Sequence, residues 1–388
     1  MKKILVFMLG ALIATVNITA QPVNFIQGKW EDARAKALSE KKYLFVDCFT
    51  EWCGWCKTLD KNTFSDSKVG ELMNKNFVAV KIDMEKDYGI NLSMKYRVNA
   101  FPTALIFNPE GKLVYRIMGY SDPDKYLGLL NDAMNPAKQY NLLGITDKID
   151  LDFPQFYRDA FAGNGKRKWP DQKVVSDFLD QQKDLYDEIS WAVIKVCDGG
   201  EKYNKQVLDN AAKYRKFYGP EVDDKIASIL YSQLSLAIKS KDVNKFNLCI
   251  NNVNKYGGES KDEMLQSFNL SYYSGIGDWT GFAKVFQGYL DKDGYKEAGT
   301  INSYCWNIYE KCEDQAIVSK ACQWMKRALE TDSQYAYLDT YAALLYKNKQ
   351  YSEAETQAKK AIEAGKKSGD DFKSTQDLLE KILAAQNK

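Results

Sequence analysis

Short apolar runs alternate with segments of helical periodicity over the first third of the chain. Runs rich in β-branched and aromatic residues are typical of buried strands, and they occur at 43–49, 77–83 and 103–107. Helix-forming or helically periodic segments lie around them, at 28–41, 57–62, 65–73, 88–97 and 121–133. A further strand, 112–118, follows a tight turn that contains Pro109 and Gly111. This order predicts an α/β fold in which helices flank a mixed central sheet.

The pattern changes near residue 134, and the rest of the chain is expected to be helical. Pro136 marks a linker, and residues 221–388 contain no proline, which favours helices throughout. Polar residues precede aromatic or apolar ones in the pairs Asp242-Val243, Asp278-Trp279 and Gln350-Tyr351. Aromatic or small residues follow at intervals of 36, 39 and 33 residues, at Phe246, Phe282, Ala321 and Ala354. Such intervals indicate helix-pair repeats, with 370–386 as a capping helix.

The first twenty residues have the features of a secretory signal. Lys2 and Lys3 precede an apolar run at 4–16, and Ala20 precedes the expected cut. The run is too short for an ordinary membrane span, although an uncleaved N-terminal anchor stays open as an alternative. We therefore expect an exported, periplasmic protein that consists of a signal peptide at 1–20, an α/β domain at 21–135 and a helical domain at 136–388.

Composition narrows the class of protein further. The chain has 388 residues and a formal net charge of +2, which falls to about zero once Lys2 and Lys3 are removed. A balanced charge argues against nucleic acid as a partner. The chain contains no histidine, which excludes the Ser/His/Asp and Cys/His arrangements of hydrolases.

The clearest chemical signal is the sequence Trp52-Cys53-Gly54-Trp55-Cys56-Lys57, where a predicted strand gives way to a helix. Two cysteines at this spacing can close a small disulfide or open to two thiols. Cys53 should lie near the unsatisfied amides and the positive end of the helix dipole, which lower the pKa of its thiol. Cys56, one turn further on, is better shielded and should react second. Trp52 and Trp55 should form an apolar surface for brief contact with extended polypeptides.

Three other interpretations of these cysteines stay open at this point. A zinc site normally needs four ligands, and the chain has neither histidine nor a second Cys-x-x-Cys. Cys48 completes part of an iron–sulfur spacing, but on its strand it should face away from Asp47 and pack as a small apolar residue. A purely structural disulfide is the third interpretation. The remaining cysteines are expected to be buried free thiols: Cys197, Cys249, Cys305, Cys312 and Cys322.

One carboxyl group is expected inside the α/β domain. Asp47 lies between Val46 and Cys48 on a strand that should be buried. A carboxyl group buried without its own hydrogen-bond partners has a raised pKa, so it can take or give a proton as Cys56 reacts. Lys81, on the next strand, is the candidate partner. The alternative is a salt bridge that has no part in catalysis.

Taken together, these motifs resemble the thioredoxin superfamily over about residues 28–135. Asp47, six residues before Cys53, matches the family's buried acid, and Lys81 matches its lysine partner. Two further matches are the family's cis-proline loop and a glycine after the last strand, at Ala100-Phe101-Pro102-Thr103 and Gly119. The stretch 63–69 further resembles the reducing, periplasm-facing domain of bacterial transmembrane thiol:disulfide interchange proteins.

The resemblance implies a thiol–disulfide oxidoreductase with a thioredoxin fold. Cys53 would attack a substrate disulfide, Cys56 would resolve the mixed disulfide, and Asp47 with Lys81 would manage the proton of Cys56. The residues expected to contact substrate are Trp52, Trp55, Phe101, Pro102 and Thr103. From the sequence alone, an ordinary trans proline is the alternative at Pro102. No metal is implied, and no cofactor beyond the Cys53–Cys56 disulfide.

The direction of electron flow and the partners of the protein are further expectations. Trp55 stands where strong oxidants and isomerases of the superfamily often carry a histidine that stabilises the thiolate. Because Trp55 cannot do this, we expect a more reducing protein here. Net reduction of protein disulfides would require a membrane electron donor. The last units of the helical domain resemble a tetratricopeptide repeat, so this domain either binds a peptide or protein partner or only positions the redox domain. The alternative function is that of a non-enzymatic interaction protein, whose thiols tether a partner or sense the redox state.

Overall fold

The computed structural model describes residues 21–163, 165–292 and 294–387. The signal peptide expected at 1–20 lies outside these residues. The chain divides into two compact units, of which the first ends at Lys225 and the second begins at Ile226. The first unit contains the α/β domain, and the second is helical.

Within the described residues, five strands form one sheet in the order β1-β3-β2-β4-β5. They are β1 (Phe25–Ile26), β2 (Tyr43–Phe49), β3 (Phe77–Asp83), β4 (Thr103–Phe107) and β5 (Leu113–Met118). β2 lies parallel to β3 and antiparallel to β4, which confirms the predicted mixed sheet. The bounds of β2, β3 and β4 agree with the prediction, and β5 begins one residue later. β1 is an addition, because a two-residue strand is too short to show a periodic pattern.

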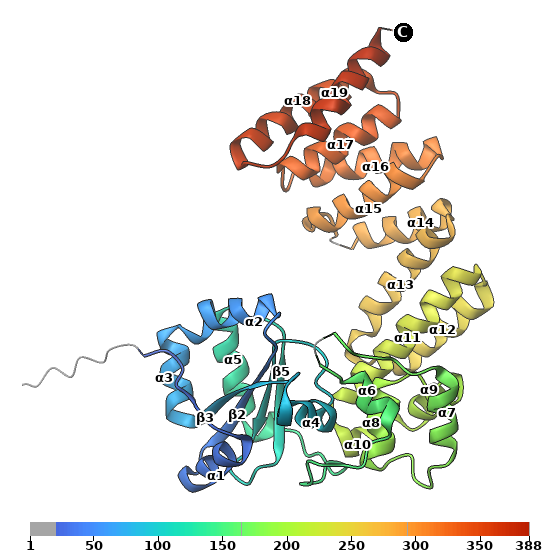
Figure 1. Ribbon diagram of the computed structural model, residues 1–388. Helices are drawn as coiled ribbons and strands as arrows, with labels where there is room; N and C mark the ends of the chain where they lie inside the picture. Colours follow the sequence, from blue (N-terminus) through green and yellow to red (C-terminus); the bar gives the residue numbers. More distant parts are fainter. Residues whose placement is uncertain (1–20, 164, 293, 388) are drawn as a thin grey trace, which may run out of the picture. The chain divides into compact units, whose positions relative to one another are not determined.

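Helices cover both faces of this sheet (Figure 1). They are α1 (Trp30–Glu40), α2 (Gly54–Leu59), α3 (Ser67–Asn76), α4 (Asp87–Tyr96) and α5 (Pro123–Met134), with a π-helix at Asp60–Phe64. α1 and α4 pack on the face that carries Val46 and Cys48, whereas α2, α3 and α5 pack on the face that carries Phe45. Since side chains alternate along a strand, Asp47 shares the face of Phe45, and Cys48 packs on the other face, as predicted.

The first unit continues well past residue 135, where the sequence places a domain boundary. After a 3₁₀ turn at Pro136–Lys138 it contains α6 (Gln155–Ala160), α7 (Gln172–Asp180), α8 (Glu188–Val196), α9 (Glu201–Asp209), α10 (Ala211–Tyr218) and the beginning of α11 (Glu221–Ser240). We call residues 136–225 the helical extension. Two ion pairs join it to the end of α4: Lys95 Nζ lies 2.6 Å from Glu188 Oε1, and Arg97 Nη2 lies 2.9 Å from Glu221 Oε1.

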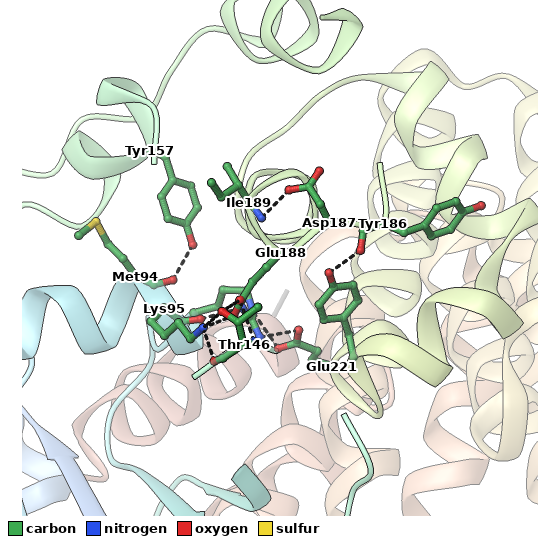
Figure 2. Close-up of polar contacts among 11 residues, drawn as sticks. Met94, Lys95, Thr146, Tyr157, Tyr186, Asp187, Glu188, Ile189 and Glu221 are labelled. Atoms are coloured by element: carbon green, nitrogen blue, oxygen red, sulfur yellow. Dashed lines mark hydrogen bonds and ion pairs between the residues drawn. The ribbon is translucent and has the colours of Figure 1, made fainter. Parts of the chain in front are cut away.

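Lys95 is the centre of a buried polar network (Figure 2). Its side chain is fully buried and donates hydrogen bonds to the backbone oxygen and the hydroxyl of Thr146, at 2.7 and 3.1 Å. Glu188 in turn accepts hydrogen bonds from the amide and the hydroxyl of Thr146. Breaking a buried ion pair leaves an uncompensated charge, so the contact between Lys95 and Glu188 resists separation. This explains why the compact unit extends to Lys225 instead of ending at residue 135.

The second unit is built from consecutive helices that follow α11. They are α12 (Val243–Tyr256), α13 (Lys261–Ile276), α14 (Trp279–Leu290), α15 (Ala298–Lys311), α16 (Gln315–Ala328), α17 (Tyr335–Lys347), α18 (Tyr351–Ser368) and α19 (Lys373–Gln386). The residues that precede every second helix are spaced 36 apart: Asp242, Asp278, Asp314 and Gln350. This even spacing fits the predicted helical-repeat domain.

The register of the third repeat differs from the prediction. Val318 is the counterpart of Phe246 and Phe282, because it lies four residues after the cap Asp314, as they do after theirs. Ala321, which the sequence places in that register, lies nearly one turn further along α16. The predicted repeat lengths of 36, 39 and 33 residues are therefore wrong, and successive repeats begin at even intervals of 36 residues.

Small residues line the interior of the second unit. Four alanines of α16 and α18 are fully buried: Ala321, Ala328, Ala354 and Ala361. The cysteines expected to be free thiols are indeed free and buried throughout the described chain. Among the residues that the structure describes, none of the helices combines the length and the apolar character that a membrane crossing requires.

Candidate functional site

Cys53 and Cys56 form a disulfide where α2 begins. Cys53 precedes the helix in an extended conformation, and Cys56 lies in its first turn. The backbone amide of Cys56 donates a hydrogen bond to Cys53 Sγ at 3.0 Å. An amide donor and the positive end of the helix dipole both stabilise a thiolate. Once the disulfide is reduced, Cys53 is therefore the sulfur suited to nucleophilic attack.

Two aromatic pairs lie beside the disulfide. Trp52 packs edge-on against Phe101, with ring centroids 5.9 Å apart, and Trp55 lies 5.6 Å from Tyr120. The two cysteines are only 4% and 5% exposed, whereas Trp52 and Trp55 are 65% and 62% exposed. A polypeptide that approaches the sulfurs therefore meets the indoles first. The sequence reasoning did not include Tyr120, although an aromatic residue directly after Gly119 was a signal that could have found it.

The loop before β4 has the geometry that the family resemblance implies. The Phe101–Pro102 peptide bond is cis, and the backbone oxygen of Pro102 accepts a hydrogen bond from the amide of Gly119 at 2.9 Å. Thr103 is buried, and its hydroxyl donates to the backbone oxygen of Ala100 at 2.8 Å. The Thr103 side chain therefore shapes the loop and does not join Phe101 at the surface.

Asp47 lies buried on the sheet face that α2 covers. Its side chain is 2% exposed, and within the described part of the chain Oδ1 has no hydrogen-bond partner. Burial raises the pKa of this carboxyl group from its ordinary 3.8 to about 6, even though the charge of Lys81 acts in the opposite direction. A carboxyl group with a pKa near neutrality can both accept and return a proton under physiological conditions.

Lys81 lies opposite Asp47 in the pairing of β2 with β3. Its Nζ is 3.1 Å from Asp47 Oδ2 and also pairs with Asp60 Oδ1. The rings of Phe25, Phe49 and Phe64 surround the ammonium group, at 5.0, 5.6 and 5.7 Å from Nζ to the centroids. The structure thus brings the two predicted residues together and adds Asp60, a contact that depends on the π-helix and that the sequence does not signal.

Glu85 is a further residue of this region that the sequence reasoning missed. It follows β3 and is only 8% exposed. One carboxylate oxygen, Oε2, accepts a hydrogen bond from Trp52 Nε1 at 3.0 Å, and the other, Oε1, lies 3.2 Å from Nη2 of Arg167 in the helical extension. No local pattern marks Glu85, because both contacts join residues distant in the sequence.

Comparison with known proteins identifies the α/β domain. A family model described as a thioredoxin-like domain matches residues 30–134. Residues 30–134 are a thioredoxin-like domain. Similar curated proteins include a protein disulfide-isomerase of Zea mays, 26% identical over 108 residues, and the thiol:disulfide interchange protein DsbD of Actinobacillus pleuropneumoniae serotype 5b (strain L20), 30% identical over 97 residues. The matches cover 28% and 24% of this chain, and 21% and 16% of those proteins, so the chain spans about a fifth of their length.

Solved structures match the same part of the chain. A Bacteroides thetaiotaomicron protein known from a solution structure is 41% identical, with 30% of this chain and 96% of that chain covered and a TM-score of 0.28. A thioredoxin from Thermus thermophilus is 22% identical, with 29% and 88% covered and a TM-score of 0.28. The thioredoxin-like domain and its Cys53–Cys56 pair support thiol–disulfide redox chemistry.

Proposed function

We propose that the chain is an exported thiol–disulfide oxidoreductase that reduces disulfides in other proteins. The observation that carries the proposal is the Cys53–Cys56 disulfide, which lies where a helix begins and beside two exposed indoles. Asp47, with a pKa of about 6, supplies a buried proton acceptor on the sheet face that the same helix covers.

The reaction begins from the reduced pair. The Cys53 thiolate attacks one sulfur of the substrate disulfide, which forms a mixed disulfide and releases the first substrate thiolate. Asp47 accepts the proton of the Cys56 thiol, and Lys81 holds the carboxylate through its contact at 3.1 Å. The Cys56 thiolate then attacks Cys53 Sγ, which restores the disulfide and releases the second substrate thiolate. The substrate gains two electrons, and the Cys53–Cys56 pair loses them.

The direction of this reaction depends on what reduces the pair again. Trp55 between the cysteines carries no positive charge, so it lacks the means by which a histidine stabilises the thiolate and makes a protein oxidising. An exported pair lies outside the cytosol and its reductants, so net reduction requires a membrane protein as the electron donor. The pattern of residues 1–20 supports export to the periplasm, and the helical repeats of the second unit offer a surface for a protein partner.

The activity is tested with insulin, whose interchain disulfides are a convenient polypeptide probe. The full chain without residues 1–20 should accelerate the reduction of insulin by dithiothreitol. The Cys53→Ser variant should fall to the rate of dithiothreitol alone, whereas Cys48→Ser, which alters a buried cysteine on the opposite sheet face, should retain the activity. Equal rates for the wild type and Cys53→Ser would contradict the proposal.

A redox titration tests the direction separately. Oxidised and reduced glutathione are mixed at defined ratios, and alkylation followed by mass spectrometry reports the state of Cys53 and Cys56. A reductase should keep the pair oxidised until the mixture is strongly reducing. A pair that becomes reduced in mildly oxidising mixtures would contradict the proposed direction and leave an oxidase or isomerase.

A further inference from the structure

The helical extension reaches the residue next to the reactive cysteine. Arg167, in the loop between α6 and α7, places Nη2 3.2 Å from Glu85 Oε1. Glu85 Oε2 accepts the hydrogen bond of Trp52 Nε1 at 3.0 Å. Trp52 directly precedes Cys53. A continuous line of polar contacts therefore connects the extension with the entrance to the disulfide.

The loop that carries Arg167 is held in place by its backbone. Gly163 lies so close to Glu85 that an added β-carbon would be 2.4 Å from the backbone oxygen of Glu85. The amide of Lys168 donates a hydrogen bond to the backbone oxygen of Asp159 at 3.0 Å. Arg167 is half-buried, whereas its neighbours Lys166 and Lys168 are exposed. Arg167 is thus the half-buried cation of this loop, and it pairs with Glu85.

Trp52 depends on such support because most of its surface is open to solvent. It is 65% exposed, and its ring contact is the edge of Phe101, with centroids 5.9 Å apart. An exposed side chain samples several rotamers unless a directional contact selects one. The bond from Nε1 to Glu85 selects an orientation, provided that the carboxylate itself is fixed. Arg167 helps to fix it, because the guanidinium group binds the second oxygen and so restricts the rotation of the carboxylate.

We propose that Arg167 is a positioning residue of the oxidoreductase site. Through Glu85 it holds the Trp52 indole in the orientation that receives the polypeptide on either side of a substrate disulfide. The helical extension is thereby part of the substrate surface for proteins. A small disulfide reaches Cys53 without covering the indole, so its reaction does not need Arg167. This inference rests on the proposed function, since it assumes that Cys53 and Cys56 reduce protein disulfides.

The test compares a polypeptide disulfide with a small one. Steady-state reduction of insulin by the full chain, with dithiothreitol as electron source, gives kcat and KM. The reaction of the pre-reduced chain with 5,5′-dithiobis(2-nitrobenzoate) in a stopped-flow instrument gives the rate with a small disulfide. Arg167→Ala should raise the KM for insulin about threefold to tenfold, as expected for the loss of one hydrogen-bonded contact, and leave kcat and the small-disulfide rate near the wild-type values.

Two variants in the same loop act as controls. Lys168→Ala removes an exposed positive charge one residue away and should keep the wild-type KM. Arg167→Lys retains a cation opposite Glu85 and should recover part of the lost affinity. A KM that rises equally in Lys168→Ala and Arg167→Ala would show that general charge attracts insulin, and it would overturn the positioning role.

Trp52→Phe tests the pathway itself, because phenylalanine keeps an aromatic ring but lacks the Nε1 donor. It should raise the KM as Arg167→Ala does, and adding Arg167→Ala to it should cause no further rise. Fold-changes that multiply in the double variant would overturn the inference. Should Arg167→Ala fail to fold by circular dichroism, a wild-type KM in Trp52→Phe would overturn it just as clearly.

Failure of the inference and failure of the proposed function give different results. If Cys53→Ser reduces insulin as fast as the wild type, the proposed function is wrong and the inference falls with it. If Cys53→Ser is inactive and Arg167→Ala has the wild-type KM, the proposed function stands and only the positioning role is wrong.

Discussion

Replacing Asp47 by asparagine should remove a pH dependence from the stability of the first unit. Burial has the largest influence on the pKa of this carboxyl group, which is raised from 3.8 to about 6. In the unfolded chain the group ionises near its ordinary value, whereas in the folded chain it keeps its proton until about pH 6. Well below pH 4 the group is protonated in both states, and folding carries no ionisation cost. Above about pH 6 it is ionised in both states, and the folded state bears the cost of a buried charge.

The size of this cost follows from the difference between the two pKa values. Since one pKa unit corresponds to 1.36 kcal/mol, the whole cost is about 3 kcal/mol, and about 2 kcal/mol of it should appear as a fall in the free energy of unfolding between pH 4 and pH 7 because of Asp47 alone. Asp47→Asn is neutral at every pH and should not show this fall. The free energy of unfolding of Asp47→Asn minus that of the wild type should therefore rise by about 2 kcal/mol between pH 4 and pH 7.

Hydrogen exchange measured by mass spectrometry on the oxidised protein checks this expectation. Peptides from β2 and β3 report the opening of the first unit separately from the helical repeats. Asp60→Asn is the matched control, because it removes the exposed partner of Lys81 and leaves the buried carboxyl group in place. The control should keep the fall in stability between pH 4 and pH 7. A difference between Asp47→Asn and the wild type that stays constant over this range would refute the reasoning.

Three further expectations concern other parts of the molecule. Cys56→Ser should accumulate mixed disulfides through Cys53 with several client proteins on non-reducing gels, and capture of one partner or none would favour the interaction protein instead. Glu188→Gln should destabilise the first unit by about 3–5 kcal/mol, because the fully buried Lys95 would lose the carboxylate that compensates its charge; unchanged hydrogen exchange in α4 and α8 would contradict this. Cys48→Ala should leave the reduction potential of the disulfide unchanged, since Cys48 packs on the opposite face of the sheet, and a shifted potential would show that this placement is wrong.

Local patterns in the sequence predict the sheet and the reactive pair well. The strands at 43–49, 77–83 and 103–107 have the predicted bounds, because burial on both faces produces continuous apolar runs with clear ends. Cys53 and Cys56 are bonded, because a fixed spacing along a helix determines which side chains meet. Asp47 faces Lys81 across two strands, a pairing that the family resemblance implied.

The parts that the sequence did not predict depend on contacts between distant residues. The helical extension belongs to the first unit because Glu188 and Glu221 pair with Lys95 and Arg97. In the sequence these are ordinary charged residues, and nothing nearby shows that they become buried. Arg167 beside Glu85 is a case of the same kind. The regular spacing of the repeats was obscured for a different reason, since Ala321 resembles the expected small residue more closely than Val318 does.

The central claim is that Cys53 and Cys56 exchange electrons with another polypeptide. A single-turnover experiment tests it most directly: the fully reduced chain is mixed with an equal amount of insulin, and the thiols of both proteins are alkylated and located by mass spectrometry over time. The account predicts that the Cys53 and Cys56 thiols disappear together while two insulin thiols appear for each pair lost. Cys53 and Cys56 that stay reduced beside intact insulin would contradict it.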